Sequence, residues 1–405
     1  MKRLIAFLMA VICAFGIMAC GTKTKTEKAE AEVESVEGAD SYKIGVIVYS
    51  NTDEEVVSFR NYLEGYIAEV FPAITFLYSD SITTEEEELE FIQKACDEGA
   101  DGMLSFLTMD LKKEVDLCAQ NKVYYMLASG SVSPEEFRKV AENPYFIGAV
   151  GPGSELEYRT GSDMAAFFAD QKFGDQYFVL SGGAGIGNEM HLQRTIGILD
   201  KLQEKYGVTF EQSSREIALS TEPVHATAGE LTVCVTPGYI AREEFLEPAI
   251  AEYGKDAYQV VLSVLPIAGM ADIVKDCHLG LVDCYTDTNL QLFNKGELSY
   301  LAGKYSSIVG PSFAAMYNAV TGFAEDFRED GKAFSLTQGF WYSDSPEDYA
   351  EKYALANSVI SNAYNYEDLG KVCKVYNPDA TLEDLKVLIS AYSYEDAKNR
   401  RESQE

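Results

Sequence analysis

The sequence predicts an α/β protein with two doubly wound parallel sheets, each forming one lobe. Short, almost uninterrupted apolar runs alternate with segments of helical periodicity along most of the chain, and strands of a parallel sheet covered on both faces have this pattern. The runs are too many for one open sheet, and no eightfold repeat indicates a closed barrel. The length of 405 residues also exceeds what a single hydrophobic core usually organises.

The expected elements follow one another in strand–helix order from residue 42. Each strand is rich in large apolar residues, and each helix has apolar residues three or four positions apart. We expect strands over 42–50, 73–80, 100–106, 122–129, 144–151, 176–183, 231–239, 257–266, 279–287 and 305–311. We expect helices over 53–71, 83–98, 108–121, 133–142, 154–171 and 189–206, with further helices between the later strands and beyond a short strand in 337–344.

The first residues predict a signal peptide over 1–19. Lys2 and Arg3 precede an apolar stretch that is too short for a comfortable membrane span. The stretch ends in "IMAC" and resembles a bacterial lipobox, which implies cleavage before Cys20 and attachment of a diacylglyceryl group to its sulfur. The alternative is an ordinary secreted protein with a coincidental cysteine. Residues 20–41 are rich in Thr, Lys, Glu and Ala and contain no aromatic residue, so we expect a flexible tether there.

The charge of the chain excludes some partners. The formal net charge is −32, and loss of Lys2 and Arg3 with the signal peptide makes it −34. Such a surface repels phosphate backbones and anionic lipids, so we expect no nucleic-acid partner and no membrane contact except through Cys20. The simplest use of the negative charge is solubility.

A glycine-rich turn, "SGGAGIGNE" over 181–189, follows one expected strand and precedes a helix. A dinucleotide-binding turn needs a third glycine where Asn188 stands, and a phosphate loop needs Lys and Ser or Thr where Asn188 and Glu189 stand. A carboxylate repels phosphate. We therefore expect a tight turn with another use, and no nucleotide cofactor.

Catalytic and metal-binding patterns are weak. The histidines, His191, His225 and His278, fall in separate elements, and the chain contains no Gly-x-Ser-x-Gly motif. We expect no catalytic residue and no enzyme activity. "CHLGLVDC" over 277–284 fits no common zinc spacing, so we expect no metal site. We expect the cysteines after the tether to be buried as small apolar side chains, and the sequence does not decide whether any of them form disulfides. They are Cys96, Cys118, Cys234, Cys277, Cys284 and Cys373.

The expected strand ends predict where a ligand binds. In doubly wound sheets, ligands lie beyond the carboxyl ends of the strands. The segments at these positions are rich in Ser, Thr, Gly, Asn and Tyr, which suits hydrogen bonding and stacking on a small polar molecule. They are 49–53, 105–108, 128–131, 151–154, 182–189, 236–239, 265–269 and 285–288.

Several segments, in this order, resemble a known family over about residues 42–330. They are "KIGVIVYS", "GADGMLSF", "IGAVGPGSELEYRTGSDMA", "FVLSGGAGIGNEMHLQRTIGILDKL" and "FNKGELSYLAG". Together they resemble the type I periplasmic solute-binding proteins, the ribose-binding-protein-like lipoproteins of ABC importers.

The resemblance implies a division into lobes joined by a hinge with several crossings. Lobe 1 is expected over 42–150 and about 311–340, and lobe 2 over 151–310 and about 341–405. The expected crossings lie near 148–153, 310–311 and 338–343, where glycine, proline and strand ends occur.

The resemblance also places a ligand in the cleft between the lobes. Tyr49, Phe106, Tyr285 and Trp341 are candidates for stacking on the ligand, with ordinary packing as the alternative for each ring. Arg194 is a ligand contact or one half of an ion pair with a neighbouring acid, and His191 is a contact or a packed or solvated side chain. The full expected ligand-binding set is Tyr49, Asn51, Phe106, Ser129, Asn188, His191, Arg194, Tyr285, Asp287 and Trp341.

The sequence departs from the sugar-binding members of the family at two places. Ala128-Ser129 stands where such members have Asp-Arg, and Leu265-Pro266 stands where they have Asn-Asp. In those members, charged groups that form two hydrogen bonds hold the sugar hydroxyls. Because this chain lacks such groups at the two places, a nucleoside-like ligand is an alternative to a sugar.

The resemblance implies an extracytoplasmic, membrane-anchored, monomeric lipoprotein that delivers a small solute to the permease of an ABC importer. The alternative is a surface lipoprotein that senses the solute and signals to a membrane receptor.

Overall fold

The computed structural model describes residues 41–404 except 72 and 359–361. The expected signal peptide, Cys20 and all of the tether but Ser41 lie outside the described residues. The described residues belong to one compact unit. Among the described helices, none has the length and hydropathy needed to cross a bilayer.

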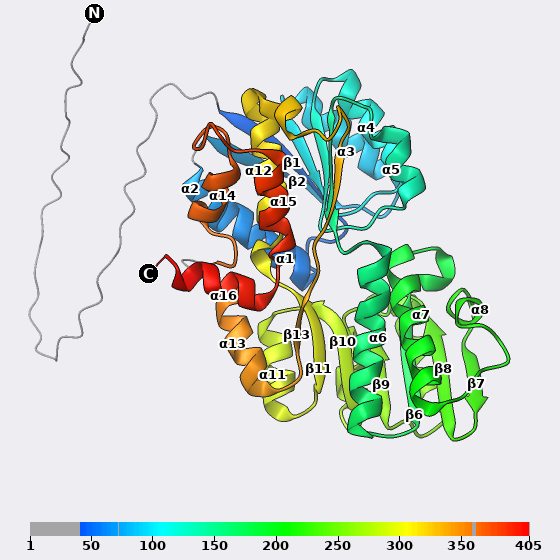
Figure 1. Ribbon diagram of the computed structural model, residues 1–405. Helices are drawn as coiled ribbons and strands as arrows, with labels where there is room; N and C mark the ends of the chain where they lie inside the picture. Colours follow the sequence, from blue (N-terminus) through cyan, green and yellow to red (C-terminus); the bar gives the residue numbers. More distant parts are fainter. Residues whose placement is uncertain (1–40, 72, 359–361, 405) are drawn as a thin grey trace, which may run out of the picture. The chain divides into compact units, whose positions relative to one another are not determined.

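The first sheet is six-stranded and parallel throughout (Figure 1). Its order is β12 (Phe334–Thr337), β5 (Phe146–Gly151), β4 (Tyr124–Ala128), β3 (Gly102–Ser105), β1 (Tyr42–Val48) and β2 (Ile74–Ser81). The helices between its strands are α1 (Glu54–Tyr62), continued by η1 (Leu63–Ile67) and α2 (Ala68–Val70), then α3 (Glu85–Asp97), α4 (Leu111–Gln120) and α5 (Pro134–Val140). We call this sheet and its helices the first lobe.

The second sheet has seven strands, with antiparallel strands at both edges. Its order is β13 (Trp341–Ser343), β11 (Tyr300–Lys304), β10 (His278–Cys284), β9 (Val260–Ser263), β6 (Gln176–Gly182), β8 (Leu231–Pro237) and β7 (Val224–Ala228). Its helices are α6 (Gly153–Gln171), η2 (Ala184–Ile186), α7 (Glu189–Tyr206), α8 (Ser214–Ala218), α9 (Glu243–Tyr253), η3 (Ala268–Met270), α10 (Ala271–Val274), α11 (Asp287–Lys295) and α13 (Pro346–Ala356). This is the second lobe, and the two sheets confirm the predicted fold class.

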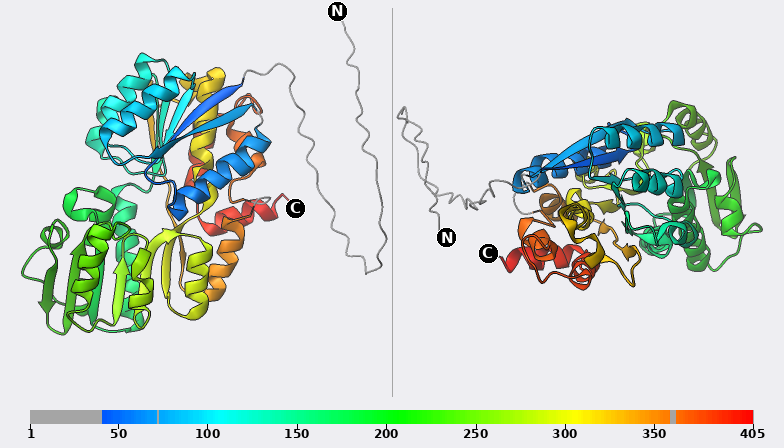
Figure 2. Two further views of the ribbon diagram at one scale, coloured as in Figure 1. Left: turned by 180° about the vertical axis from the view of Figure 1, so that it is seen from behind. Right: turned by 90° about the horizontal axis from the view of Figure 1, so that it is seen from above.

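The chain passes between the two sheets at three places (Figures 1 and 2). β5 ends at Gly151 before α6, β12 ends at Thr337 before β13, and β11 is followed by η4 (Ser306–Val309) and α12 (Gly310–Asn318). α12 packs on β3, β4 and β5, so it belongs to the first lobe. These places lie close to the three expected crossings.

The predicted strand over 305–311 is wrong. Residues 306–318 form η4 and α12, and the strand that pairs with β10 is Tyr300–Lys304 instead. Every residue of α12 is buried, so its apolar run has no exposed face to show helical periodicity. A short continuous apolar run does not distinguish a strand from a buried helix, and Pro311 occupies the first turn of the helix, where proline is favoured.

The C-terminal extension contacts both lobes. α13 packs on α11 and β13, whereas α14 (Tyr366–Val372) and α15 (Leu382–Ser390) pack on α12, and α15 also packs on β12. The sequence assigned all of 341–405 to the second lobe, but the part beyond α13 lies against the first. Helical periodicity shows which face of a helix is apolar and does not show which sheet that face meets.

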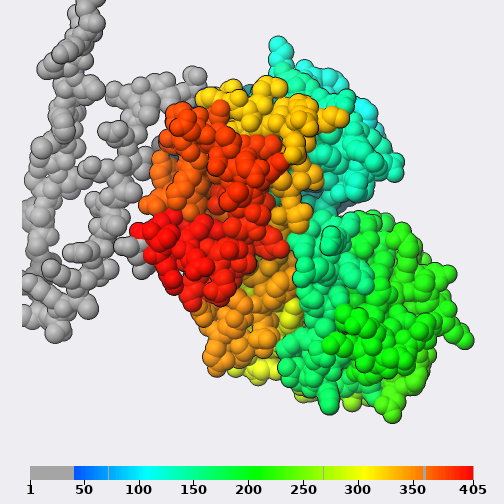
Figure 3. All heavy atoms as spheres, in the orientation of Figure 1, coloured from blue at the N-terminus to red at the C-terminus, as the bar shows by residue number. Residues whose placement is uncertain are grey.

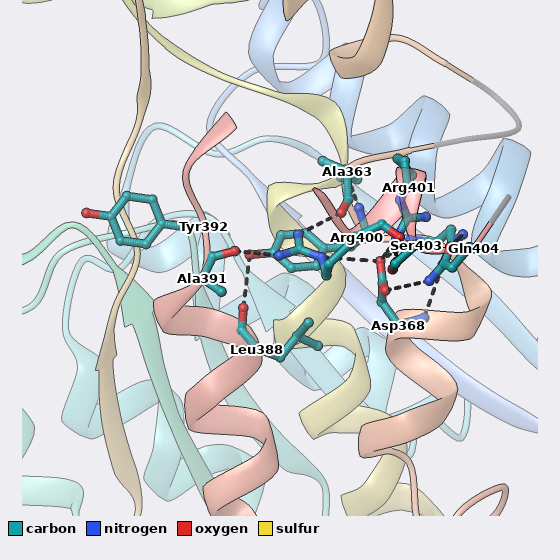
Figure 4. Close-up of polar contacts among 12 residues, drawn as sticks. Ala363, Asp368, Leu388, Ala391, Tyr392, Arg400, Arg401, Ser403 and Gln404 are labelled. Atoms are coloured by element: carbon teal, nitrogen blue, oxygen red, sulfur yellow. Dashed lines mark hydrogen bonds and ion pairs between the residues drawn. The ribbon is translucent and has the colours of Figure 1, made fainter. Parts of the chain in front are cut away.

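The last helix, α16 (Tyr394–Glu402), is tied to both neighbours. Lys398 pairs with Glu351 of α13 at 2.8 Å. At the other end, Arg401 pairs with Asp368 of α14, and Arg400 donates to the Ala363 carbonyl at 2.9 Å (Figure 4). α16 therefore joins elements packed on different lobes.

Candidate functional site

The carboxyl ends of strands from the two lobes meet around Lys304, the last residue of β11. Its ammonium group lies 2.9 Å from Glu55 Oε1, in the first turn of α1, and 3.2 Å from the carbonyl oxygen of Ser129, directly after β4. Glu55 and Ser129 belong to the first lobe and Lys304 to the second. An ammonium group has three donors, so these two hydrogen bonds, among the described residues, leave one N–H of Lys304 for another partner. Figure 3 shows the first lobe (cyan to blue-green) and the second (green) meeting at a notch.

Ser129 combines backbone strain with an unsatisfied hydroxyl group. Its φ is +56°, in the left-handed region that a residue other than glycine adopts only at a cost. Its Oγ is buried and has no hydrogen-bond partner among the described residues, and the same holds for Ser131 Oγ. Strained residues and orphaned buried polar groups are concentrated at functional sites. Both observations fall at the carboxyl end of a first-lobe strand.

Acidic groups of both lobes surround this junction. The Tyr49 hydroxyl donates to Asp53 at 3.1 Å. Burial, with help from the Glu55 charge, raises the pKa of the Asp53 carboxyl. In the second lobe, burial raises the pKa of Asp283 to about 7, although the side chain of Asn289 donates to it at 2.9 Å. The junction therefore contains a carboxyl group that changes charge near neutral pH.

The glycine turn is held by His191. The Nδ1 atom of His191 accepts from the backbone N–H of Gly183 at 2.9 Å, which leaves the ring proton on Nε2. Burial, with the nearby Arg194 and Lys304 charges, lowers the pKa of His191 to about 3, so the ring is neutral. Gly182 has a φ of +57°, and a Cβ atom there would lie 2.5 Å from the His191 ring. The turn is packed on this ring, and the N–H of Gly183 is already satisfied by the protein.

Arg194 forms a buried ion pair inside the second lobe. Its guanidinium group donates to both carboxylate oxygens of Glu157 on α6 and to the Val264 carbonyl after β9, at 2.7 Å. The side chains are 6% and 0% exposed. Helices α6 and α7 approach closely enough for this contact because residue 161 is glycine: a Cβ there would lie 1.9 Å from the Arg194 carbonyl oxygen. Of the two alternatives the sequence left open, the structure contains the ion pair.

Comparisons with known proteins show which solved structures share this fold. No protein-family model and no curated protein sequence matches the chain. Solved structures do match. One is the periplasmic binding protein of an arabinose ABC transporter from Shewanella sp. ANA-3, bound to L-arabinofuranose, at 12% identity and a TM-score of 0.57 over 77% of this chain and 94% of that one. Another is a solute-binding protein from Bacillus halodurans C-125 with bound myo-inositol, at 15% identity and a TM-score of 0.56 over 78% and 98%.

A galactofuranose-binding protein matches at 12% identity and a TM-score of 0.58, over 78% of this chain and the whole of that one. The chain has the fold of the type I periplasmic binding proteins. Each of these matches is below 25% identity, so the likeness concerns the fold. The strand ends that meet at Lys304 occupy the interlobe position of this binding-protein fold.

The other first-lobe residues of the expected set lie at the strand ends of the binding-protein fold. Asn51 follows β1, and its side-chain amide donates to the Ser79 carbonyl at 3.3 Å. Phe106 follows β3, is buried, and packs on Phe59 with ring centroids 5.1 Å apart. Lys304 Nζ lies 6.0 Å from the Phe59 ring centroid, so this aromatic pair borders the junction.

The other second-lobe residues of the set are held by neighbouring side chains. Asn188 is the N-cap of α7: its Oδ1 accepts from the His191 backbone N–H, and its Nδ2 donates to the Tyr239 hydroxyl at 3.1 Å. Asp287, in the first turn of α11, accepts from the Tyr353 hydroxyl of the C-terminal extension.

Tyr285 and Trp341 pack among other rings. Both are 2% exposed. Trp341 stacks on Tyr305 at 3.9 Å and donates to the Tyr392 carbonyl, and Tyr285 stacks on Tyr349 at 4.9 Å. The packing alternative therefore describes both rings.

Sequence reasoning missed Lys304, Glu55, Glu157 and Asp283. With a strand expected to begin at residue 305, Lys304 fell before the strand instead of at its carboxyl end. A lysine that closes an apolar run, as in "YLAGK", is the signal that would have identified it. Glu157 carries no comparable signal, because its partner Arg194 lies on the next helix and the acids near it in the sequence look alike.

Proposed function

We propose that the mature protein binds a small polar solute between its two lobes and presents it to the permease of an ABC importer. The observation that carries this proposal is Ser129: a strained serine with an orphaned, buried hydroxyl group, at the interlobe position of a binding-protein fold. A ligand hydroxyl in this place satisfies Ser129 Oγ and the remaining N–H of Lys304. Only a state with both lobes on the ligand makes all of these contacts, so binding favours closure of the lobes.

The chemistry of the junction favours a neutral, hydroxyl-rich ligand. Ser129 and Ser131 supply free hydroxyl groups, and the acids around Tyr49 disfavour an anion. The matched binding proteins were solved with L-arabinofuranose and with myo-inositol. We propose a sugar or cyclitol as the ligand class. A nucleoside remains the second candidate because the aromatic rings of Phe59, Phe106 and Phe340 border Lys304 or its neighbours and offer stacking surfaces.

We also propose that the protein is anchored through a lipid on Cys20 and acts as a binding protein without enzymatic activity. The lipobox-like "IMAC" and the following tether-like composition support the anchor. Changing Cys20→Ala should release the protein from the membrane or block its processing, measured by detergent-phase partitioning. Unchanged partitioning of the variant would refute the anchor.

The experiment on the ligand is a thermal-shift screen of the chain from Gly21 onward against L-arabinose, myo-inositol, D-fucose and adenosine. A bound ligand raises the melting temperature by mass action. We expect at least one of the first three to do so. A shift with adenosine alone moves the proposal to nucleosides, and a ligand turned over on the protein would contradict a pure binding function.

Two substitutions connect the ligand to the site. Ser129→Gly removes the hydroxyl group and relieves the left-handed strain, so the ligand-free protein should be as stable as before or up to about 1 kcal/mol more stable, while affinity falls about tenfold or more. Lys172→Gly is the matched control, because Lys172 has a φ of +58° at the end of α6, away from the junction. It should gain stability and keep its affinity. Unchanged affinity in Ser129→Gly would mean that Ser129 does not touch the ligand.

A further inference from the structure

A second cluster of ligand-type side chains lies away from the lobe junction, where the β7–β8 hairpin meets the end of α9. His225 is on β7, Cys234 is opposite it on β8, and Glu252 is in the last turn of α9. One donor atom from each residue lies within 4.8 Å of the others. Cys234 and Glu252 are buried, whereas the His225 side chain is 42% exposed.

Two of the three donor–donor distances are close to those around a tetrahedral transition-metal ion, and the third, between Cys234 Sγ and a Glu252 oxygen, is at most 4.8 Å. Zn–N and Zn–S bonds of about 2.0 and 2.3 Å give an N···S edge of about 3.5 Å, and His225 Nε2 lies 3.7 Å from Cys234 Sγ. His225 Nε2 and Glu252 Oε1 are 2.7 Å apart as a hydrogen bond, and an ion between them needs this edge to widen by roughly 0.6 Å. A small rotation of the exposed imidazole ring provides that change.

Groups around the cluster support the three donors. Asp256 Oδ2 lies 3.9 Å from His225 Nδ1, on the far side of the ring, where a carboxylate orients a metal-bound histidine. The Tyr258 hydroxyl is buried beside the Cys234 thiol and has no hydrogen-bond partner among the residues that the structure describes. A thiolate accepts hydrogen bonds, so a metal-bound Cys234 satisfies this orphaned donor. Lys255 pairs with the other oxygen of Glu252 at 2.6 Å and leaves Oε1 for the metal.

We propose that His225, Cys234 and Glu252 bind one zinc ion, with water in the fourth, solvent-facing position. A nitrogen, a sulfur and an oxygen ligand together favour zinc over magnesium or calcium, which take oxygen ligands. Binding releases the Cys234 thiol proton to solvent, and one further proton if both nitrogens of the His225 ring are protonated; the neutral ring keeps its proton on Nδ1. Zinc with one thiolate and one carboxylate carries no net charge, which suits a partly buried site. The ion fastens α9 to β7, the edge strand of the second sheet.

This inference is independent of the solute bound between the lobes. It replaces the sequence expectation of no metal site, which weighed the segment 277–284 instead. That segment does not form a cluster: the His278 ring stacks on Phe173 at 3.8 Å, and Cys277 contacts the Tyr253 hydroxyl at 2.9 Å. His225 and Cys234 come together because the hairpin pairs them across two strands, and Glu252 is supplied by a helix further along the chain.

The test is a calorimetric titration of zinc chloride into the reduced, chelator-treated chain from Gly21 onward, followed by the absorption spectrum of the cobalt(II) form. We expect one micromolar or tighter zinc site per chain and a near-ultraviolet thiolate-to-cobalt band. His225→Ala, at an exposed position, should fold normally and lose at least tenfold in zinc affinity, and Cys234→Ser should lose the cobalt band. Cys96→Ser is the matched control and should change neither.

Three outcomes would overturn the site. They are no zinc binding below millimolar concentrations, no thiolate band, or zinc affinity unchanged by His225→Ala. If Cys234→Ser fails to fold, the His225→Ala titration and the wild-type cobalt spectrum still decide the result.

Discussion

Two ion pairs lie near Phe340, and they differ in what they join. Lys304 Nζ and the Arg194 guanidinium carbon lie 6.0 and 5.4 Å from the Phe340 ring centroid. The pair of Lys304 with Glu55 connects the lobes, and its side chains are 8% and 16% exposed. The pair of Arg194 with Glu157 lies within the second lobe and is more completely sealed from water.

The difference separates a charge that is held within one lobe from a charge whose partners belong to the other lobe. Arg194 is held by two carboxylate oxygens and a carbonyl group within one lobe, so its contacts do not depend on the angle between the lobes. Lys304 reaches two groups of the opposite lobe, one of them the strained Ser129. Its surroundings would therefore change if the lobes moved apart.

The largest effect is expected from Arg194→Ala. The substitution leaves the Glu157 carboxylate buried without its partner, and loss of one member of a buried pair typically costs about 3–5 kcal/mol. Denaturant unfolding of the ligand-free chain measures this loss. The double variant Arg194→Met with Glu157→Leu removes both charges and should recover much of it. A ligand-free protein of normal stability with lost sugar affinity would instead make Arg194 a ligand contact.

Next in size is Lys304→Met, which should act on binding. Loss of a hydrogen bond from a charged donor costs about 1.5–3 kcal/mol, so affinity for the sugar identified by thermal shift should fall about tenfold or more. Glu55 is nearer to water, and the ligand-free stability should change by only about 1 kcal/mol. Lys352→Met is the control, since Lys352 pairs with Asp348 on its own helix. Equal affinities of the two variants would remove Lys304 from the site.

A smaller effect concerns pH and the interlobe acids. The pKa of Asp283 is raised to about 7, so its protonated form stabilises the folded state below about pH 4, and this stabilisation is lost as the pH rises through 7. The pKa of His191 is lowered to about 3, so its neutral ring stabilises the folded state above about pH 6.5. This stabilisation is lost as the pH falls from 6.5 towards 3. The two trends offset each other between pH 4 and 6.5 in the wild-type protein.

The difference in stability between wild type and Asp283→Asn isolates the carboxyl group. As the pH rises from 4 to 8, the free energy of unfolding of Asp283→Asn should increase relative to that of wild type by roughly 1–3 kcal/mol. Denaturant unfolding at each pH measures this change. A difference independent of pH would show that Asp283 is charged over the whole range.

The smallest effect is expected at the glycine turn. Asn188→Ala removes the N-cap of α7 and should cost about 1 kcal/mol of stability. Affinity should stay the same, because both polar atoms of the Asn188 amide are used within the second lobe. Asn188→Ser keeps a capping oxygen and should recover most of the stability. Loss of affinity in both variants would return Asn188 to the ligand site.

The fold was predictable from the sequence because continuous apolar strands and periodic helices are local signals. The secondary-structure prediction failed at α12, where complete burial leaves no helical periodicity in the sequence. The lobe assignment failed at α14 and α15, because the sequence does not show which sheet a helix packs against. In the site, Ser129 was expected because it follows a strand. The contact of Lys304 with Glu55 joins residues 249 positions apart, and no spacing in the chain indicates it. Trp341 and Tyr285 look like stacking residues in sequence, and only the surrounding rings show that they are core.

The most direct test of the central claim is small-angle X-ray scattering of the chain from Gly21 onward, with and without a saturating concentration of the sugar or cyclitol that raises its melting temperature. If the solute binds between the lobes and draws them together around Lys304 and Ser129, the radius of gyration should fall on saturation. A radius of gyration that stays the same at saturation would contradict binding by closure of the lobes.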